Sequence, residues 1–221
     1  MKESFHHIVT ALMVACSVAS LVIVAKQNLF GAGGTRRPAV EKISDASQFA
    51  SRGYILGDGR SPNKIVLFSD FQCPFCAKVM HVLDSLQESG TSVSVVLRHV
   101  PSVSHPRASL LASAFECGAA QAEPTALARA LFSIANAATD SAIFDVAVST
   151  GVADSAKFAV CMDSEEVRVV LRRDSLDAAR LKVVGTPTLL IGDIRANGLP
   201  TPDSLAAYVQ RIRGTHGSAA P

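Results

Sequence analysis

Two cysteines three residues apart, directly after an apolar run rich in β-branched residues, constrain this chain more than any other feature. The run is Ile65–Ser69, and the pair lies in Cys73-Pro74-Phe75-Cys76. A proline is tolerated in the first helical turn, because its missing N–H would have no partner there anyway. The segment therefore predicts a strand followed by a helix, with Cys73 at the helix N-terminus and Cys76 one turn further in.

This position favours redox chemistry. Unpaired backbone N–H groups and the positive end of the helix dipole stabilise a thiolate at Cys73. Such surroundings lower the pKa of a cysteine from about 8.5 to roughly 3.5 to 7.5. Only the thiolate attacks a disulfide. The same spacing also occurs in structural zinc sites, but these need four ligands, and no second Cys-x-x-Cys is present. We therefore expect a redox dithiol and no metal.

Composition excludes some classes of partner. The chain has 221 residues, with 21 Lys and Arg, 19 Asp and Glu, and a formal net charge of +2. The basic residues are scattered, so nucleic acid is not an expected partner. With no Trp and two Tyr, a stacking platform for bases or sugars is not expected either. The length suits one domain with a substantial core and a short appendage.

The N-terminus has the composition of an export signal or a membrane anchor. Ile8–Ala25 contains no charged residue and reaches the lower length limit for crossing a bilayer. A cleaved signal peptide usually has a shorter apolar core followed by a small-x-small site, whereas Val18-Ala19-Ser20 lies inside the run. We expect residues 1–25 to be an uncleaved anchor, with a cleaved signal peptide as the alternative. Cys16 is then an apolar residue of the anchor rather than a lipidation site.

Three further regions follow from composition. Residues 26–40 include Gly31-Ala32-Gly33-Gly34 and predict a flexible linker. Residues 41–213 form the folded domain, whose first part is expected to contain one short strand near Tyr54–Leu56. Residues 214–221 are expected to be a disordered tail.

Strand, helix and strand follow one another around the dithiol. Apolar residues at helical spacing extend the helix over about four turns through Ala77–Glu88, and Gly90 ends it. The valine-rich segment Ser92–Val100 predicts the second strand. A parallel βαβ unit places its reactive site beyond the carboxyl ends of the strands, which is where Cys73 lies.

A helical region separates this unit from a later one. Residues 106–182 predict four or five helices, after which a strand resumes at Thr188–Ile191, followed by a turn, Ile194-Arg195 and a closing helix over Thr201–Arg213. Thr186-Pro187 immediately precedes the later strand, and a proline entering a strand is a natural place for a cis bond. The expected helical core comprises Leu110, Leu111, Phe115, Leu127, Leu131, Phe132, Ile134, Phe144, Val146 and Phe158.

The chain resembles the DsbA-like members of the thioredoxin superfamily, which have a helical domain inserted between the two halves of the thioredoxin fold. The similarity covers about Val40 to Arg213. It is carried by Phe68–Cys76, Phe115-Glu116-Cys117, Phe158–Cys161 and Gly185–Thr188. It implies an α/β thioredoxin fold with an inserted helical domain at about residues 106–182.

The resemblance also implies roles for individual residues. Cys73 is expected to be the exposed nucleophile, Cys76 the resolving thiol and Pro187 the cis-proline opposite them. Pro74 and Phe75 support the site, and the backbone of Thr186 is expected to pair with an extended substrate peptide.

Two departures from the family pattern concern the dithiol itself. Phe75 replaces the histidine of the strongest oxidants, so a polar stabiliser of the Cys73 thiolate is missing. The strand Ile65–Ser69 contains no acidic residue. The nearest acid, Asp70, is expected to be a loop or capping residue, with a proton shuttle as the alternative.

Several nearby side chains allow two interpretations. Phe71 and Phe75 are expected to form a hydrophobic rim for substrates, although Phe71 suits the core equally. His99 and His105 flank the loop after the second strand and are either solvated or close to the dithiol.

Cys117 and Cys161 are expected to form a structural disulfide. Cys117 shares a helical face with Leu110 and Ala114, and Cys161 shares one with Phe158, so both thiols should point inward. Two inward cysteines in an oxidising compartment usually pair. Two buried free thiols are the alternative.

The expected function is that of a membrane-tethered thiol–disulfide oxidoreductase outside a bacterial cytoplasmic membrane. As a monomer without cofactor, it would form disulfides in exported cysteine-containing polypeptides, and a quinone-linked membrane partner would reoxidise it. If the signal were cleaved, the protein would be periplasmic or secreted. Two alternatives stay open. One is a reductase or isomerase on the same fold, and the other is a binding or metal-handling module that uses Cys73 and Cys76 as ligands.

Overall fold

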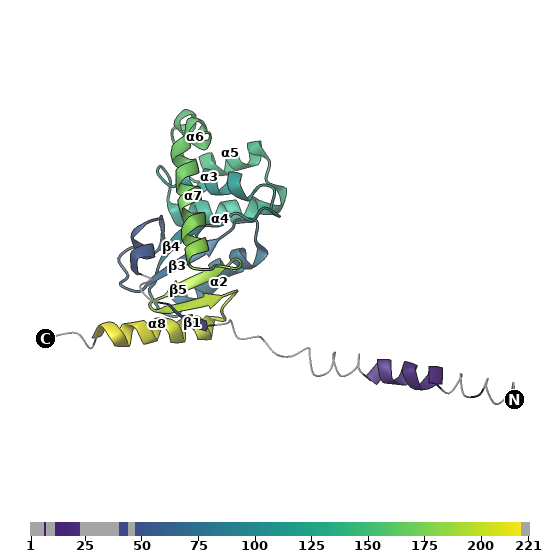
Figure 1. Ribbon diagram of the computed structural model, residues 1–221. Coiled ribbons are helices and arrows are strands. Elements are labelled where there is room, and N and C mark those ends of the chain that lie inside the picture. The colour runs from purple at the N-terminus through teal and green to yellow at the C-terminus, as the bar shows by residue number, and fades with distance from the viewer. Residues whose placement is uncertain (1–6, 8–11, 23–39, 44–46, 218–221) are drawn as a thin grey trace. The chain divides into compact units, whose positions relative to one another are not determined.

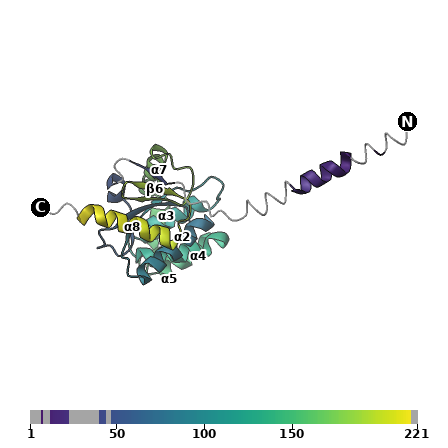
Figure 2. The same ribbon diagram turned by 90° about the horizontal axis from the view of Figure 1, so that it is seen from below.

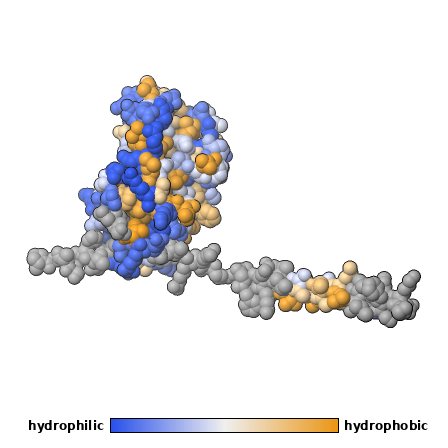
Figure 3. Space-filling view, viewed as in Figure 1, coloured by the Kyte–Doolittle hydropathy of each residue, from blue (hydrophilic) through white to orange (hydrophobic). Residues whose placement is uncertain are grey.

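The computed structural model describes residues 7, 12–22, 40–43 and 47–217, in two units, Met1–Arg37 and Pro38–Pro221. In the first unit, residues 12–22 are helical, and their apolar side chains are exposed (Figure 3). None of the helices within the described ranges is long and apolar enough to cross a membrane. Parts of the predicted anchor, and all but the last residue of the predicted linker at 26–40, lie outside the described residues.

The second unit is built on a six-stranded sheet with strand order β1-β6-β5-β3-β4-β2. Its strands are β1 (Val40–Lys42), β2 (Ile55–Gly57), β3 (Lys64–Ser69), β4 (Ser94–His99), β5 (Thr188–Ile191) and β6 (Ile194–Asn197). Its helices are η1 (Ser47–Ser51), α2 (Pro74–Glu88), α3 (Ala108–Gly118), α4 (Pro124–Ile134), η2 (Ala135–Ala137), α5 (Asp140–Ser149), α6 (Ser155–Met162), α7 (Glu165–Arg180) and α8 (Pro202–Gly217).

The central strand β3 carries the site at its carboxyl end. It pairs in parallel with β4, with Leu67 opposite Leu97, and antiparallel with β5. The predicted parallel βαβ unit, β3-α2-β4, is therefore confirmed. Two elements were not predicted, namely the helix η1 and the edge strand β1, which pairs with β6.

The pleat of β3 divides its side chains between the two faces of the sheet. Ile65 and Leu67 join the core formed with α2 and α8, whereas Val66 and Phe68 join the core formed with η1 and α7. Figure 2 shows α8 lying across the sheet, beside α2. Because side chains alternate along a strand, Ser69 belongs to the α2 face, with Ile65 and Leu67.

Helices α3 to α7 lie between β4 and β5 in the chain and gather at one end of the sheet (Figure 1). Phe115, Leu127 and Leu131 form part of their buried core, as predicted. Phe144 is 39% exposed, so its assignment to the core is wrong. On α5 the inward positions belong to Ile143 and Ala147, and Phe144 only touches Phe158 edge to face.

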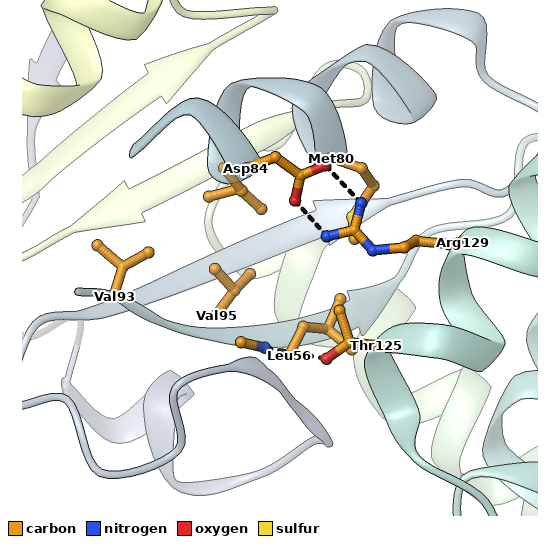
Figure 4. Close-up of a pocket in the computed structure, with 9 residues that line it drawn as sticks. Leu56, Met80, Asp84, Val93, Val95, Thr125 and Arg129 are labelled. Carbon is orange, nitrogen blue, oxygen red and sulfur yellow. Dashed lines mark hydrogen bonds and ion pairs between the residues drawn. The ribbon is translucent and has the colours of Figure 1, made fainter. Parts of the chain in front are cut away.

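Charged contacts join the helical region to β4 and to α2. The fully buried guanidinium of Arg98, at the end of β4, donates from Nε to Asp174 at 2.8 Å and from Nη2 to Asp177 at 2.6 Å, both on α7. On the other face, Arg129 of α4 makes a bidentate ion pair with Asp84 of α2. Asp84 and Arg129 also line a small pocket whose apolar wall includes Leu56, Met80, Val93 and Val95 (Figure 4).

The last helix extends further than predicted. We expected helix over Thr201–Arg213 and a disordered tail from residue 214, but α8 continues to Gly217. Gly214 weakens a helix by only about 1 kcal/mol relative to alanine and does not stop it, as an internal proline would. Residues 218–221 lie outside the described residues.

Candidate active site

The turn between β3 and α2 places Cys73 at the helix N-terminus. The Cys73 N–H donates to the Asp70 carbonyl at 3.0 Å, and α2 begins at Pro74. The Cys73 carbonyl accepts from the N–H groups of Cys76 at 3.0 Å and Ala77 at 3.3 Å. Cys73 therefore occupies the N-cap position, and Cys76 lies one turn further in, as the proline at the first helical position predicts.

The two thiols, both free and both buried, differ mainly in acidity. Cys73 is only 6% exposed, so the prediction that it is exposed is wrong, and Cys76 is completely buried. A hydrogen bond from the Cys76 thiol lowers the pKa of Cys73 to about 5, against the opposing effect of burial. Further hydrogen bonds, with Thr186 and with the backbone N–H groups of Cys76 and Phe75, also lower it. Burial, helped by the hydrogen bond to Cys73, raises the pKa of Cys76 far above its usual range. Near neutral pH, the pair is a thiolate at Cys73 beside a thiol at Cys76.

The loop before β5 lies against this pair. The Thr186–Pro187 peptide bond is cis, and the Cys73 Sγ lies 3.3 Å from the Thr186 carbonyl oxygen, to which the neutral thiol donates. The Thr188 hydroxyl donates to the Gly185 carbonyl at 2.8 Å, which fixes the loop locally. The structure thus brings together Cys73, Cys76, Thr186 and Pro187 from segments more than a hundred residues apart.

Exposed apolar side chains lie in the first turn of α2 and on the loops that follow β4 and precede Thr186. Phe75, between the two cysteines, is 54% exposed, with Lys78 Nζ at 5.6 Å from its ring centroid. Val184, before the Thr186 loop, and Val103, after β4, are also largely exposed. These residues give the surroundings of the dithiol an apolar character that suits unfolded polypeptide.

Phe71 does not belong to this surface. It is only 3% exposed and packs against Phe132 and Phe115, with ring centroids 4.6 and 5.6 Å away. Its assignment as a substrate-binding residue is therefore wrong. Burying a large aromatic side chain between the sheet and the helical region is favoured over exposing it.

Asp70 organises the loops around the dithiol. Its carboxylate accepts from the N–H groups of Gln72 and Ser102, both at 2.8 Å, and lies 2.7 Å from Nδ1 of His105. This arrangement supports the capping interpretation rather than the proton shuttle. His99 is buried instead of solvated, with Nε2 at 2.9 Å from the Glu116 carboxylate.

Gln72 is a site residue that the sequence reasoning missed. Its amide Nε2 donates to the Ala135 carbonyl at 2.9 Å, and its Oε1 accepts from the Arg107 N–H at 2.6 Å. The residue next to Cys73 is therefore tied to the helical region at two points. Both partners are distant in sequence, so no local pattern could have indicated these contacts.

Cys117 of α3 and Cys161 of α6 are joined by a disulfide with a Cα–Cα distance of 5.7 Å. This value lies inside the range of about 4.4 to 6.8 Å that an unstrained bridge requires. The bridge lies in the helical region and leaves Cys73 and Cys76 as a separate pair. Across the described part of the chain, no group of three or more His, Cys, Asp or Glu side chains is placed to hold a metal ion.

Known proteins resemble this chain in sequence. The thioredoxin family model matches residues 50–211. A protein of Mycolicibacterium vanbaalenii named Na(+)/H(+) antiporter NhaA 1 is 32% identical over 156 residues, which is 66% of this chain and 24% of that protein. The homologous protein of Mycolicibacterium gilvum is 31% identical over 172 residues, 74% of this chain and 27% of that protein. The chain thus spans about a quarter of the length of these relatives.

Solved structures share the fold. A thioredoxin-like oxidoreductase from Silicibacter pomeroyi superposes with a TM-score of 0.68 at 21% identity, covering 77% of this chain and 99% of that one. BdbD from Bacillus subtilis superposes with a TM-score of 0.62 at 18% identity, covering 80% of this chain and 98% of that one. The thiol-disulfide exchange protein α-DsbA2 from Wolbachia pipientis superposes with a TM-score of 0.60 at 20% identity, covering 72% of this chain and 86% of that one.

These findings confirm the resemblance drawn from the dithiol and the segment before β5. The family model spans most of the domain, including both of these segments. The chain belongs to the thioredoxin family, and its fold is that of the DsbA-like thiol–disulfide oxidoreductases.

Proposed function

We propose that the domain catalyses thiol–disulfide exchange in exported proteins, with Cys73 as the nucleophile and Cys76 as the resolving thiol. The observation that carries this proposal is the contrast between the two thiols, since the pKa of Cys73 falls to about 5 while burial keeps Cys76 protonated. A low-pKa thiol at a helix N-terminus, opposite a cis-proline loop, is equipped for attack on disulfides and for release from them.

The proposed reaction takes place between the two cysteines of the domain and two thiols of the substrate. In the oxidised domain, a substrate thiolate attacks Cys73 Sγ, the Cys73–Cys76 bond breaks, and a mixed disulfide forms on Cys73. The second thiolate of the substrate then attacks its own bridging sulfur, which forms the substrate disulfide and releases Cys73 as a thiolate. The backbone of Thr186 and the exposed ring of Phe75 would hold the substrate segment in an extended conformation beside Cys73.

The low pKa of Cys73 favours an oxidase over a reductase. A stabilised thiolate stabilises the reduced form, so the disulfide form more readily accepts electrons from substrates. Phe75 limits this effect, because it cannot donate a hydrogen bond to the thiolate as a histidine can. We propose disulfide formation as the direction of the reaction, with reduction or isomerisation as the alternative on the same site.

The proposed setting is the outer side of a bacterial cytoplasmic membrane, to which the N-terminal segment would tether the domain. This rests on the uncharged stretch Ile8–Ala25. Reoxidation by a quinone-linked membrane protein would complete the cycle. Membrane fractionation of the full chain, with and without residues 1–25, tests the tether. Equal recovery of both forms in the soluble fraction would contradict it.

Equilibration of the domain with glutathione buffers tests whether the domain forms or reduces disulfides. The redox equilibrium constant of an oxidase should favour the reduced dithiol more than that of thioredoxin does. A reduction potential of the Cys73–Cys76 pair near or below that of thioredoxin would favour the reductase. Metal retained after purification together with no turnover of a dithiol peptide would favour the metal-handling module.

A second candidate function comes from the relatives named Na(+)/H(+) antiporters, because the matched region is about a quarter of those proteins. In this reading, the domain serves as the redox module of a membrane ion transporter. Crosslinking of the Cys76→Ser variant in membranes distinguishes the two. Adducts with many exported proteins support the general oxidase, and one adduct with an integral membrane transporter supports the second candidate.

A further inference from the structure

Ser69, the last residue of β3, has a buried hydroxyl that lacks a well-formed hydrogen bond. The residue is almost fully buried, and its Oγ makes no hydrogen bond of good geometry, although the hydroxyl is close enough to Cys76 to lower the pKa of that thiol. Such groups are rare in folded proteins, because a buried donor without an acceptor loses its hydrogen bonds to water. A hydroxyl left without a well-formed hydrogen bond at this position therefore indicates a partner that it engages fully only in another state of the site.

The pleat of the strand indicates where this hydroxyl points. Ile65 and Leu67 face α2, so Ser69 lies on the same face, next to the first turn of that helix. The side chain of that turn buried on this face is Cys76. The Ser69 hydroxyl and the backbone N–H of Asp70 both act to lower the pKa of Cys76, although burial outweighs them.

We propose that the Ser69 hydroxyl, with the Asp70 backbone N–H, forms the hydrogen-bonding site that receives the Cys76 sulfur when it leaves as a thiolate. This inference rests on the proposed thiol–disulfide exchange. When a substrate thiolate attacks Cys73, a new S–S bond forms, the Cys73–Cys76 bond breaks, and its electron pair stays on Cys76. Cys76 then takes up one proton, which balances the one lost by the second thiol of the substrate.

A donor is needed at this point because the leaving sulfur is completely buried. A buried anion without hydrogen-bond donors is strongly destabilised. In the strand Ile65–Ser69, the other positions on this face are Ile65 and Leu67, which are apolar, so Ser69 is the strand's only side-chain donor towards Cys76. A hydroxyl donates without carrying a charge, so it does not add the burial cost of a carboxylate.

Threonine and valine at position 69 provide the matched test, because they have the same shape and differ in the hydroxyl. Three quantities are measured for wild type, Ser69→Thr, Ser69→Val and Ser69→Ala. They are the rate of mixed-disulfide formation with a dithiol peptide, the equilibrium constant with glutathione, and the thermal unfolding of the oxidised form. The control is Ser113→Ala, which removes a buried hydroxyl on α3.

Ser69→Val and Ser69→Ala should lower the rate by about tenfold, the effect of losing one hydrogen bond to a charged group. They should also shift the equilibrium towards the disulfide, while the oxidised form unfolds at the same or a higher temperature. Ser69→Thr and Ser113→Ala should behave as wild type. Equal rates for Ser69→Thr and Ser69→Val, or an equal loss in Ser113→Ala, would overturn the proposal. Failure of the wild type to exchange with glutathione would instead overturn the proposed function.

Discussion

The domain contains two cysteine pairs, of which one is a reactive dithiol and the other a structural disulfide. Cys73 and Cys76 are three residues apart in one helical turn and differ in the acidity of their thiols. Cys117 and Cys161 are separated by 44 residues, lie on different helices of the helical region, and are already joined. The first pair has a cis-proline loop and exposed apolar side chains beside it, whereas the second clamps two helices together.

The comparison shows that location, rather than residue type, separates a reactive pair from a structural one. A helix N-terminus supplies N–H groups to Cys73, and the neighbouring thiol of Cys76 supplies one more donor. Cys117 lies in the last turn of α3, where the helix end offers carbonyl groups instead. Only the first location stabilises a thiolate, so the active dithiol and the structural bridge can coexist in one domain.

The largest expected effect comes from removing each thiol of the reactive pair. Cys73→Ser should abolish turnover of a dithiol peptide, because without Cys73 the domain has no Cys73–Cys76 disulfide for the substrate thiolate to attack. Cys76→Ser should lose turnover for the same reason, but its Cys73 thiolate should attack the disulfide form of the peptide, giving a mixed disulfide on Cys73 and a free peptide thiol, and the domain has no second thiol there to resolve it. Non-reducing electrophoresis of both variants with the disulfide form of the peptide checks this. Adducts in Cys73→Ser would contradict the assignment of the nucleophile.

Removing the structural bridge should affect stability rather than chemistry. In the chain-entropy model, a bridge that closes a loop of 44 residues contributes about 4 kcal/mol. The double variant Cys117→Ala, Cys161→Ala should lose about that much free energy of unfolding in urea. At a temperature where the variant is folded, its rate of peptide oxidation should match wild type. A rate loss as large as that of Cys76→Ser would contradict the assignment of Cys117–Cys161 as a purely structural bridge.

The smallest expected effect concerns Phe75, the exposed residue inside the reactive pair. Phe75→His places a donor near the Cys73 thiolate, so the redox equilibrium with glutathione should shift several-fold towards the reduced dithiol. Phe75→Leu is the control, because it keeps an apolar side chain. No shift in the histidine variant would mean that Cys76 and Thr186 already determine the acidity of Cys73.

The sequence predicted the elements with strong local signals. The strand and helix around the dithiol, the parallel second strand, the helical region and the strand after Pro187 all appear. It did not predict β1, because a strand of three residues has no periodicity, and its partners on β6 are more than 150 residues away. Thr139 and Ser164 cap α5 and α7, and each has a neighbouring Asp that is an equally suitable cap, so the sequence alone does not determine at which residue these helices begin.

In the site, spacing predicted which residues carry the chemistry but not which contacts hold them. Cys73, Cys76, Thr186 and Pro187 meet because a strand–helix junction and a strand entrance come together in the fold. The contacts of Gln72, and the burial of Phe71, depend on helices far away in sequence. No local pattern contains that information.

The most direct test of the contrast between the two pairs is the pH dependence of alkylation of the fully folded, reduced Cys73–Cys76 dithiol, followed residue by residue by mass spectrometry. The Cys73 thiolate forms as pH rises through its pKa, so labelling of Cys73 should rise with a midpoint near pH 5 and reach a plateau by neutral pH. Cys76 should stay unlabelled, because its thiol is buried and protonated, and Cys117 and Cys161 should stay protected by their disulfide. A Cys73 midpoint near the ordinary value of about 8.5, or equal labelling of Cys73 and Cys76 at pH 6, would contradict this account.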